Sequence, residues 1–207
     1  MKKVLLLVVA LAALALPASA SAYSTWTIGG SPIPEGFTIG EEYEGNFSWV
    51  EWSGGKSHPV FSCEVRLGIY AQTHEGGAQQ AWVSKFERDP EKCEGYYNYN
   101  GCVINTMTNN FSSGWDVTLN AGTPRITSPS GFVEIADTFV YPGSCPTTGK
   151  SAQWGNESSP LSLVPTVDKN GNITQIALEG QTTKGIVNYT FGPLTRVSSF
   201  PYALGIK

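Results

Sequence analysis

The clearest strand pattern in the chain is Cys63-Glu64-Val65-Arg66-Leu67-Gly68-Ile69-Tyr70. Its core-type apolar residues occupy every second position, and mostly charged or small residues stand between them. Successive side chains of a β-strand point to opposite faces of a sheet, so a period of two indicates a strand with one face turned to a core. The stretch therefore predicts a half-buried β-strand.

The same alternation recurs in Trp115 to Asn120, Phe132 to Tyr141 and Val187 to Phe191. Each run ends at a cluster of Gly, Pro, Asn or Ser, as strands do. Helical signal is nearly absent, because 23 Gly and 13 Pro residues interrupt most longer windows. The best helical candidate, Gln79 to Glu94, fits a strand equally well, because Trp82 and its apolar neighbours also alternate. We therefore expect an all-β protein.

A β-hairpin is predicted where Leu161 to Val167 and Ile173 to Leu178 flank the segment Asp168 to Asn172. Asn170-Gly171 within that segment tolerates the positive φ angles of a tight turn. Pro165 cannot donate a hydrogen bond to a neighbouring strand, so we expect its strand to lie at the edge of a sheet.

Short strands at intervals of about eight to twelve residues are typical of a sandwich or a barrel. We expect a single β-sandwich domain spanning residues 23–207, with a barrel-like variant possible. It should contain about 8–11 mostly antiparallel strands and be stapled by disulfides. Tyr23 to Gly40, which includes Pro32 and Pro34, is interpreted as an irregular lead-in or an edge strand.

Residues 1–22 have the pattern of a secretory signal peptide. Lys2 and Lys3 precede an apolar run from Val4 to Leu16, and small residues follow from Pro17 to Ala22. The run of about thirteen residues is shorter than the roughly twenty of a spanning helix. We therefore expect a secreted protein, extracellular or associated with the cell envelope, with no membrane span in the mature chain.

The charge of the mature chain argues against nucleic acid and anionic membranes as partners. Removing Lys2 and Lys3 from 13 basic residues leaves 11 against 17 acidic ones, a net charge of −6. Polyanionic partners require clusters of Lys and Arg, and the sequence contains no such cluster.

Four cysteines remain after the leader, and an even number in an oxidising compartment predicts two disulfides with three possible connectivities. We favour Cys93–Cys102 together with Cys63–Cys145. The segment between Cys93 and Cys102 contains Gly and Asn and can turn back on itself. A metal site is the alternative, but no Cys-x-x-Cys pair is present.

No motif for metal or nucleophilic chemistry stands out, and no cofactor is predicted. His58 and His74 both fall in expected loops, without the spacing of metal ligands. A Gly-x-Ser-x-Gly elbow is absent. Asp168-x-Asn170-x-Asn172 is similar to the start of a calcium loop, but Glu179 at its twelfth position falls at a strand end, which favours a plain hairpin turn.

Carboxylates offer a weaker route to catalysis. Glu41, Glu42 and Glu44 form a cluster, Glu51 stands between Val50 and Trp52, and Glu134 and Asp137 have opposite parity in one run. Glycoside hydrolysis needs two carboxyl groups roughly 5–10 Å apart. No pair can be singled out, so catalytic residues are not assigned and we favour a protein that is not an enzyme.

Aromatic residues favour a binding function. The six tryptophans, at positions 26, 49, 52, 82, 115 and 154, exceed what a core of this size requires. Tyr96, Tyr97, Asn98, Tyr99 and Asn100 lie inside the expected Cys93–Cys102 loop, where rings and amides would form a rigid, wettable contact surface. The alternative is that these tyrosines are half packed along a strand.

Several segments are similar to those of uncharacterised secreted β proteins from high-GC Gram-positive bacteria. They are the leader, Gly101-Cys102, the run Pro142-Gly143-Ser144-Cys145 and the closing segment Gly185 to Phe191. The resemblance implies no activity, so no functional residue is carried over from it.

Three functional hypotheses follow. The leading one is an exported, non-catalytic protein that binds a surface, a glycan or a protein through exposed aromatic loops. The second is a small secreted glycoside hydrolase that uses a carboxylate pair. The third is an exported inhibitor or toxin-like protein that inserts its disulfide loop into a target.

Overall fold

A computed structural model of the chain describes residues 24–96, 104–109, 114–120, 124–128, 133–139, 151–154, 160–179, 187–198 and 200–207. The expected leader, residues 1–22, lies outside these ranges. Within them the chain forms strands and no helix, which confirms the all-β prediction. No helix in this described part has both the length and the apolar character that crossing a membrane requires.

The strands have the following bounds: β1 Trp26–Ile28, β2 Ser31–Pro32, β3 Thr38–Ser53, β4 Lys56–Thr73, β5 Gln79–Gly95, β6 Ile104–Asn109, β7 Trp115–Leu119, β8 Ile126–Ser128, β9 Val133–Phe139, β10 Ser151–Trp154, β11 Leu161–Val167, β12 Ile173–Glu179, β13 Val187–Phe191, β14 Leu194–Arg196 and β15 Leu204–Ile206. The predicted strands and hairpin correspond to β4, β7, β9, β11, β12 and β13. Gln79 to Glu94, the segment that also fitted a helix, is part of strand β5.

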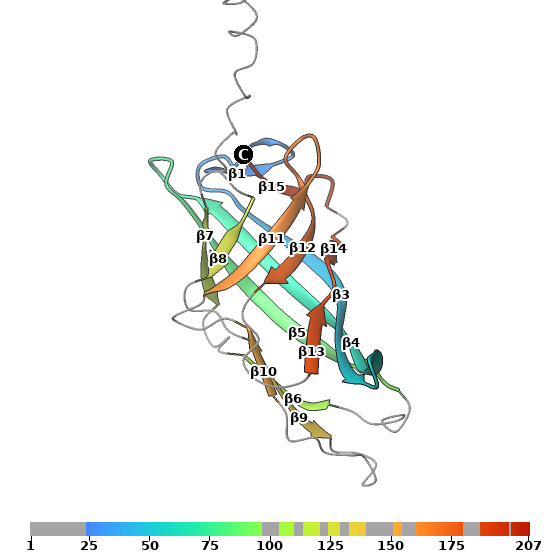
Figure 1. The fold of residues 1–207 in the computed structure, drawn as a ribbon. Coiled ribbons are helices and arrows are strands. Elements are labelled where there is room, and N and C mark those ends of the chain that lie inside the picture. The colour runs from blue at the N-terminus through green and yellow to red at the C-terminus, as the bar shows by residue number, and fades with distance from the viewer. Residues whose placement is uncertain are drawn as a thin grey trace, which may run out of the picture.

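Eight strands form a closed barrel, in the order β3, β14, β12, β11, β8, β7, β5 and β4, with β4 pairing back to β3 (Figure 1). The expectation of a sandwich is therefore wrong, and the barrel-like variant is the correct one. Alternating apolar residues occur in both architectures, because each has one buried and one solvated face. What distinguishes the two is whether the last strand pairs with the first, which alternation does not encode.

Smaller sheets flank the barrel. Strands β15, β1 and β2 form one of them, so the expected lead-in contains two short strands before β3 begins. Strands β10, β9 and β6 form another, seen below the barrel in Figure 1. Strand β13 pairs with the distal half of β3, beyond the point where β14 pairs with it.

The barrel interior is filled by apolar side chains. On β4, Val65, Leu67 and Ile69 are fully buried, whereas Arg66 and Tyr70 point outward, as the alternation predicts. Neighbouring strands contribute further buried residues, among them Tyr43, Phe47, Val83, Phe86, Trp115, Ile126, Leu163, Ile176 and Leu194. Burying an aliphatic or aromatic side chain contributes about 1.5–3 kcal/mol, so this packed interior is the main source of stability.

Two irregularities in β5 change its register against β4. Gly68 pairs with Lys85 and Ile69 with Val83, which leaves Ser84 as an extra residue. Val65 pairs with Arg88 but Cys63 with Cys93, which adds three more residues to β5. β-Bulges of this kind redirect side chains, and here Ser84 and Lys85 both line a groove on the outer face.

The β11–β12 hairpin forms as predicted, but β11 is not an edge strand. Its first residues, Leu161 to Leu163, pair with β8, and the strand pairs with β12 along most of its length. Pro165 lies beyond the last pair with β8. Its missing N–H therefore removes no hydrogen bond from the pairing with β8. Proline excludes a hydrogen-bonded neighbour only at its own position and not along the whole strand.

The disulfide within the described residues joins Cys63 to Cys93, with 4.1 Å between the Cα atoms. The expected pairs Cys63–Cys145 and Cys93–Cys102 are therefore wrong. Both residues of the observed bridge are direct partners across β4 and β5, and the bulges of β5 place them opposite each other. Cys102 and Cys145 lie outside the described residues.

Replacing both Cys63 and Cys93 by Ala should lower the free energy of unfolding by about 3.7 kcal/mol, because the bridge closes a loop across a separation of 30 residues. Chemical denaturation of the double variant and the wild type measures this. Peptide mapping without reduction should recover Cys63 linked to Cys93, and recovery of Cys93 linked to Cys102 would contradict the structure.

A buried ion pair joins the interior of β3 to the C-terminal segment. Arg196 Nε lies 2.8 Å from Glu41 Oε2, and the Glu41 side chain is fully buried. The same carboxylate oxygen accepts a hydrogen bond from the Leu204 backbone N–H at 3.1 Å. The Arg196 contact is an ion pair and not a hydrogen bond, because the Nε–H does not point at the carboxylate oxygen. Glu41 thus links β3, β14 and β15.

Replacing Glu41 by Ala should destabilise the protein by about 3–5 kcal/mol, because it leaves a partly buried guanidinium without its partner. Glu42→Ala is the matched control, since the neighbouring side chain points to solvent. Thermal unfolding of the two variants checks the difference. Equal melting temperatures would show that the buried pair has no special role.

Candidate functional site

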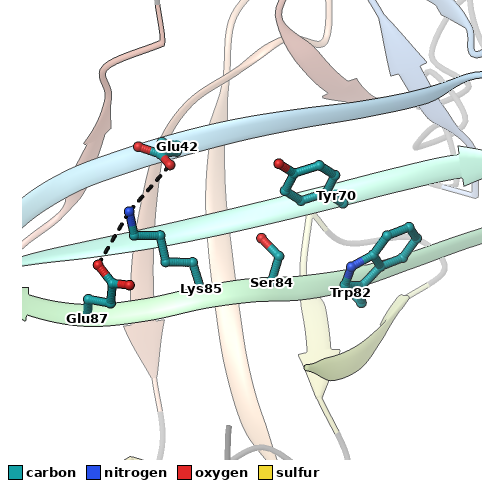
Figure 2. Close-up of a pocket in the computed structure, with 6 residues that line it drawn as sticks. All are labelled: Glu42, Tyr70, Trp82, Ser84, Lys85 and Glu87. Atoms are coloured by element: carbon teal, nitrogen blue, oxygen red, sulfur yellow. Dashed lines mark ion pairs between the residues drawn. The ribbon is translucent and has the colours of Figure 1, made fainter. Parts of the chain in front are cut away.

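A shallow groove of about 350 Å³ lies on the outer face of β3, β4 and β5. Glu42, Tyr70, Trp82, Ser84, Lys85 and Glu87 line it, and Figure 2 shows them on three neighbouring strands. Because outward-facing residues alternate with core residues, the strands that fill the barrel also fix the positions of these side chains.

Two glycines lie beside residues that line the groove. Gly40 pairs directly with Tyr70, and a Cβ atom at Gly40 would lie 2.6 Å from Tyr70 Cζ. Gly68 pairs with Lys85, and a Cβ atom at Gly68 would lie 2.9 Å from Ser84 Oγ. The Tyr70 ring can therefore lie over the backbone of β3 only because residue 40 has no side chain.

Tyr70 and Trp82 form an aromatic platform, the name we use for these two rings. They are direct partners across β4 and β5, with ring centroids 5.8 Å apart and planes inclined by 17°. Tyr70 is 40% exposed and Trp82 is half-buried. Two nearly parallel rings on a rigid sheet present apolar surface that reaches solvent.

Charged groups border the platform on one side. Lys85 Nζ lies 3.6 Å from Glu42 Oε1 and 3.3 Å from Glu87 Oε2 (Figure 2). All three side chains are substantially exposed, so these pairs contribute little to stability. They do place ammonium and carboxylate groups within reach of a ligand that rests on the rings.

Polar groups border the platform on the other side. Asp116 of β7 is the direct partner of Trp82, and its Oδ1 accepts a hydrogen bond from Gln80 Nε2 at 3.4 Å. Gln80 Oε1 in turn lies 3.2 Å from His74 Nε2. The row Gly40, Tyr70, Trp82 and Asp116 therefore crosses four strands and ends in hydrogen-bonding groups.

The predicted aromatic loop is only partly described. Tyr96, the first residue after β5, is half-buried, and its hydroxyl lies 3.4 Å from Glu94 Oε2. Tyr97, Asn98, Tyr99 and Asn100 lie outside the described residues, so the role assigned to them stays a prediction. The groove around Tyr70 and Trp82 is a separate aromatic surface, carried by strands instead of a loop.

The other candidates do not gather at one place. Glu41 points into the barrel, whereas Glu42 and Glu44 point outward, so the acidic cluster is divided between two faces. His58 and His74 are both exposed, and His74 contacts Gln80. For Glu51, Glu134 and Asp137 the backbone lies in strands but the side chains are outside the described set.

Sequence reasoning missed Tyr70 as a site residue, although it noted Trp82 among the tryptophans in excess. The signal was present in the parity of β4, because Tyr70 belongs to the outward-facing set that includes Arg66. An aromatic residue on the solvated face of a strand, beside a glycine on the next strand, indicates a surface platform. Recognising it required the register between β3 and β4.

The Asp168 loop is a hydrogen-bonded turn. Asp168 Oδ1 accepts backbone N–H groups of Asn170 and Asn172, and Oδ2 accepts the Asn172 side-chain amide at 2.9 Å. These bonds hold the β11–β12 turn. No group of three or more His, Cys, Asp or Glu that could hold a metal ion is found in the described ranges.

The hydrogen bonds from Asn172, first from its side chain and then from its backbone, hold the pKa of Asp168 below its ordinary value. Replacing Asn172 by Ala should therefore raise this pKa, as measured by NMR titration of the carboxyl carbon. Because the folded-state pKa is depressed, the stabilisation is complete above the unfolded pKa and disappears as pH falls through the folded one. An unchanged titration midpoint would contradict the assignment.

No protein family, no curated protein and no solved structure matches this chain. The resemblance to secreted β proteins of high-GC Gram-positive bacteria therefore stays a prediction. Function must be argued from the groove itself.

Proposed function

We propose that this chain is an exported, non-catalytic binding protein that holds a glycan on the Tyr70–Trp82 platform. The observation that carries the proposal is the pair of nearly parallel, solvent-reaching rings, which hydrogen-bonding groups border and of which Tyr70 lies over Gly40. Export rests on the predicted leader, residues 1–22, and agrees with the disulfide between Cys63 and Cys93.

The chemistry of a sugar ring fits this arrangement. A pyranose presents an apolar C–H face that packs on an aromatic ring, and hydroxyl groups at its rim. The platform supplies the flat apolar surface. Ser84, Lys85, Glu42 and Glu87 on one side and Gln80 with Asp116 on the other supply donors and acceptors for the hydroxyls. A few polar groups around an apolar surface are what fixes the orientation of a ligand.

A purely structural role for the rings is the main competing interpretation. Cross-strand aromatic pairs stabilise sheets by about 0.2–1 kcal/mol, and a ring over a glycine shields exposed backbone. This role accounts for the contact between Tyr70 and Gly40 but requires no particular groups around it. Removal of the rings should then change stability and leave every binding measurement unaffected.

Hydrolysis is supported less well by the groove. The contacting oxygens of Glu42 and Glu87 lie 3.6 and 3.3 Å from the same Lys85 nitrogen, so they are no more than 6.9 Å apart. This upper limit is compatible with the carboxyl separations that glycosidases use. However, the Lys85 ammonium occupies the space between the carboxylates, where a scissile bond would have to lie.

The test is isothermal titration of the mature protein with a panel of soluble oligosaccharides, with released reducing sugar measured in the same samples. At least one oligosaccharide should bind without being cleaved. Trp82→Ala should weaken that binding about tenfold, because the loss of an aromatic contact of about 1–1.5 kcal/mol corresponds to that factor.

Gly40→Ala is a second variant that leaves both rings in the chain. Its new methyl group would displace the Tyr70 ring and should weaken binding without removing any aromatic surface. Phe37→Ala is the matched control, because Phe37 is exposed and does not line the groove. Binding that survives Trp82→Ala and Gly40→Ala would exclude the groove as the site. Release of sugar would support the hydrolase.

A further inference from the structure

The outer face around the groove contains more carboxylates than cations. Three cations lie on it, and each is shared between two carboxylates: Arg66 with Glu44 and Glu64, Lys85 with Glu42 and Glu87, and Lys92 with Glu64 and Asp89. Glu64 is used twice, so five carboxylates face three cations, an excess of two negative charges. Asp116, beside Trp82, adds a third.

The three cations lie close to the carboxylates with which they pair. Arg66 Nε lies 2.5 Å from Glu44 Oε1, and Lys92 Nζ lies 2.6 Å from Glu64 Oε1. The hydrogen bond from Lys92 to Glu64 raises the pKa of the Lys92 ammonium, so it stays charged over the physiological range. A ligand that enters the groove therefore meets cations already paired with carboxylates, while the excess negative charge is uncompensated.

We propose that the groove selects glycans that carry primary amino groups, such as oligomers of deacetylated hexosamine, over neutral, N-acetylated and acidic glycans. This inference rests on the proposed function and names its ligand class. An ammonium on a sugar ring placed over the platform gains the attraction of the indole and phenol faces for a cation. It also gains Coulomb attraction from Glu42 and Glu87 on one side and Asp116 on the other.

Acidic glycans are disfavoured by the same charges. A uronate or sulfate ester over the platform would approach Glu42, Glu87 and Asp116, and the one cation among the groove residues, Lys85, already contacts two of them. Like charges brought together at an interface suppress the wrong partner. N-acetylated sugars lack the charge, so they would bind through ring stacking and hydrogen bonds alone.

A basic peptide would match the negative charge of the groove but fits the aromatic rings less well. Lysine and arginine carry their charges on flexible stems, and ordering those stems costs entropy on binding. A pyranose amine is attached directly to a rigid ring, whose C–H face packs on an aromatic ring without the ordering of a flexible stem. The rigidity of the sugar therefore favours it over the peptide.

The experiment compares hexamers of glucosamine, N-acetylglucosamine and galacturonate, together with hexa-lysine, by isothermal titration at mildly acidic pH and at low and high salt. Glucosamine hexamer should bind about twofold to fivefold more tightly than its N-acetylated counterpart, since a contact between exposed charges is worth up to about fivefold in affinity. Its advantage should decrease as salt increases. Galacturonate hexamer should bind most weakly.

Glu87→Gln and Asp116→Asn each keep a hydrogen-bonding side chain but remove one negative charge beside the platform. Each should therefore weaken the binding of glucosamine hexamer about twofold more than the binding of N-acetylglucosamine hexamer. Glu179→Gln is the matched control, because Glu179 pairs with Arg125 and not with a groove residue. Melting temperatures confirm that the variants are folded.

The outcomes separate the two proposals. Equal or tighter binding of N-acetylglucosamine or galacturonate, lost in Trp82→Ala, would overturn the amine preference and keep the glycan function. Binding of hexa-lysine in preference to all sugars would overturn the amine glycan and point to basic peptides. If none of the four ligands binds, the inference is contradicted. If no oligosaccharide of the wider panel binds either, the proposed glycan-binding function is contradicted as well.

Discussion

Closure of the barrel depends on one short strand. β14 has three residues and pairs with β3 through only two positions and with β12 through two more. So short a seam provides few backbone hydrogen bonds, whereas β3 and β4 pair along almost their full length. The ion pair between Arg196 at the end of β14 and Glu41 of β3 adds a side-chain interaction between the two strands, which share few backbone hydrogen bonds. The same carboxylate also holds the backbone of Leu204, so the C-terminal strand β15 is fastened at the same point.

Core and groove are built from the same strands, because alternation assigns each residue of β4 to one of two faces. Leu67 and Ile69 fill the interior, and Tyr70 beside them lines the groove. A ligand that rests on Tyr70 thus meets a side chain whose backbone is fixed by the packing behind it. Such a rigid platform loses little conformational freedom on binding, which favours affinity for a flat ligand. The bulge at Ser84 adds a second outward residue, Lys85, without disturbing Val83 and Phe86 inside.

Much of the fold could be predicted from the sequence, because alternation is local. It identified β4, β7, β9, β13 and the β11–β12 hairpin from runs such as Cys63 to Tyr70. Closure could not be predicted, because β14 is too short for any pattern and its partners are distant in the chain. The cysteine pairing was predicted wrongly for a related reason. Thr73 pairs with Gln79, and an unbroken register would place residue 89, not Cys93, opposite Cys63. Only the four extra residues in the bulges of β5 bring the two cysteines together.

The position of the candidate site could not be predicted from the sequence. The excess of tryptophans indicated an exposed aromatic surface but not its place. Trp82 lines the groove, whereas Trp26 and Trp115 are in the core. Parity alone does not show which outward ring lies beside which glycine, because that depends on the pairing of three strands. Nor does it show that Lys85 lies between Glu42 and Glu87, which follows from the extra residue in β5.

The most direct test of the central claim is an NMR titration that follows the indole N–H resonances of the tryptophans, with Trp82 assigned by its loss in Trp82→Phe. Addition of glucosamine hexamer should shift the Trp82 resonance in a saturable manner. The resonances of Trp26 and Trp115, which are buried, should not move. A saturable shift confined to other tryptophans, or no shift at any of them, would contradict binding on the Tyr70–Trp82 platform.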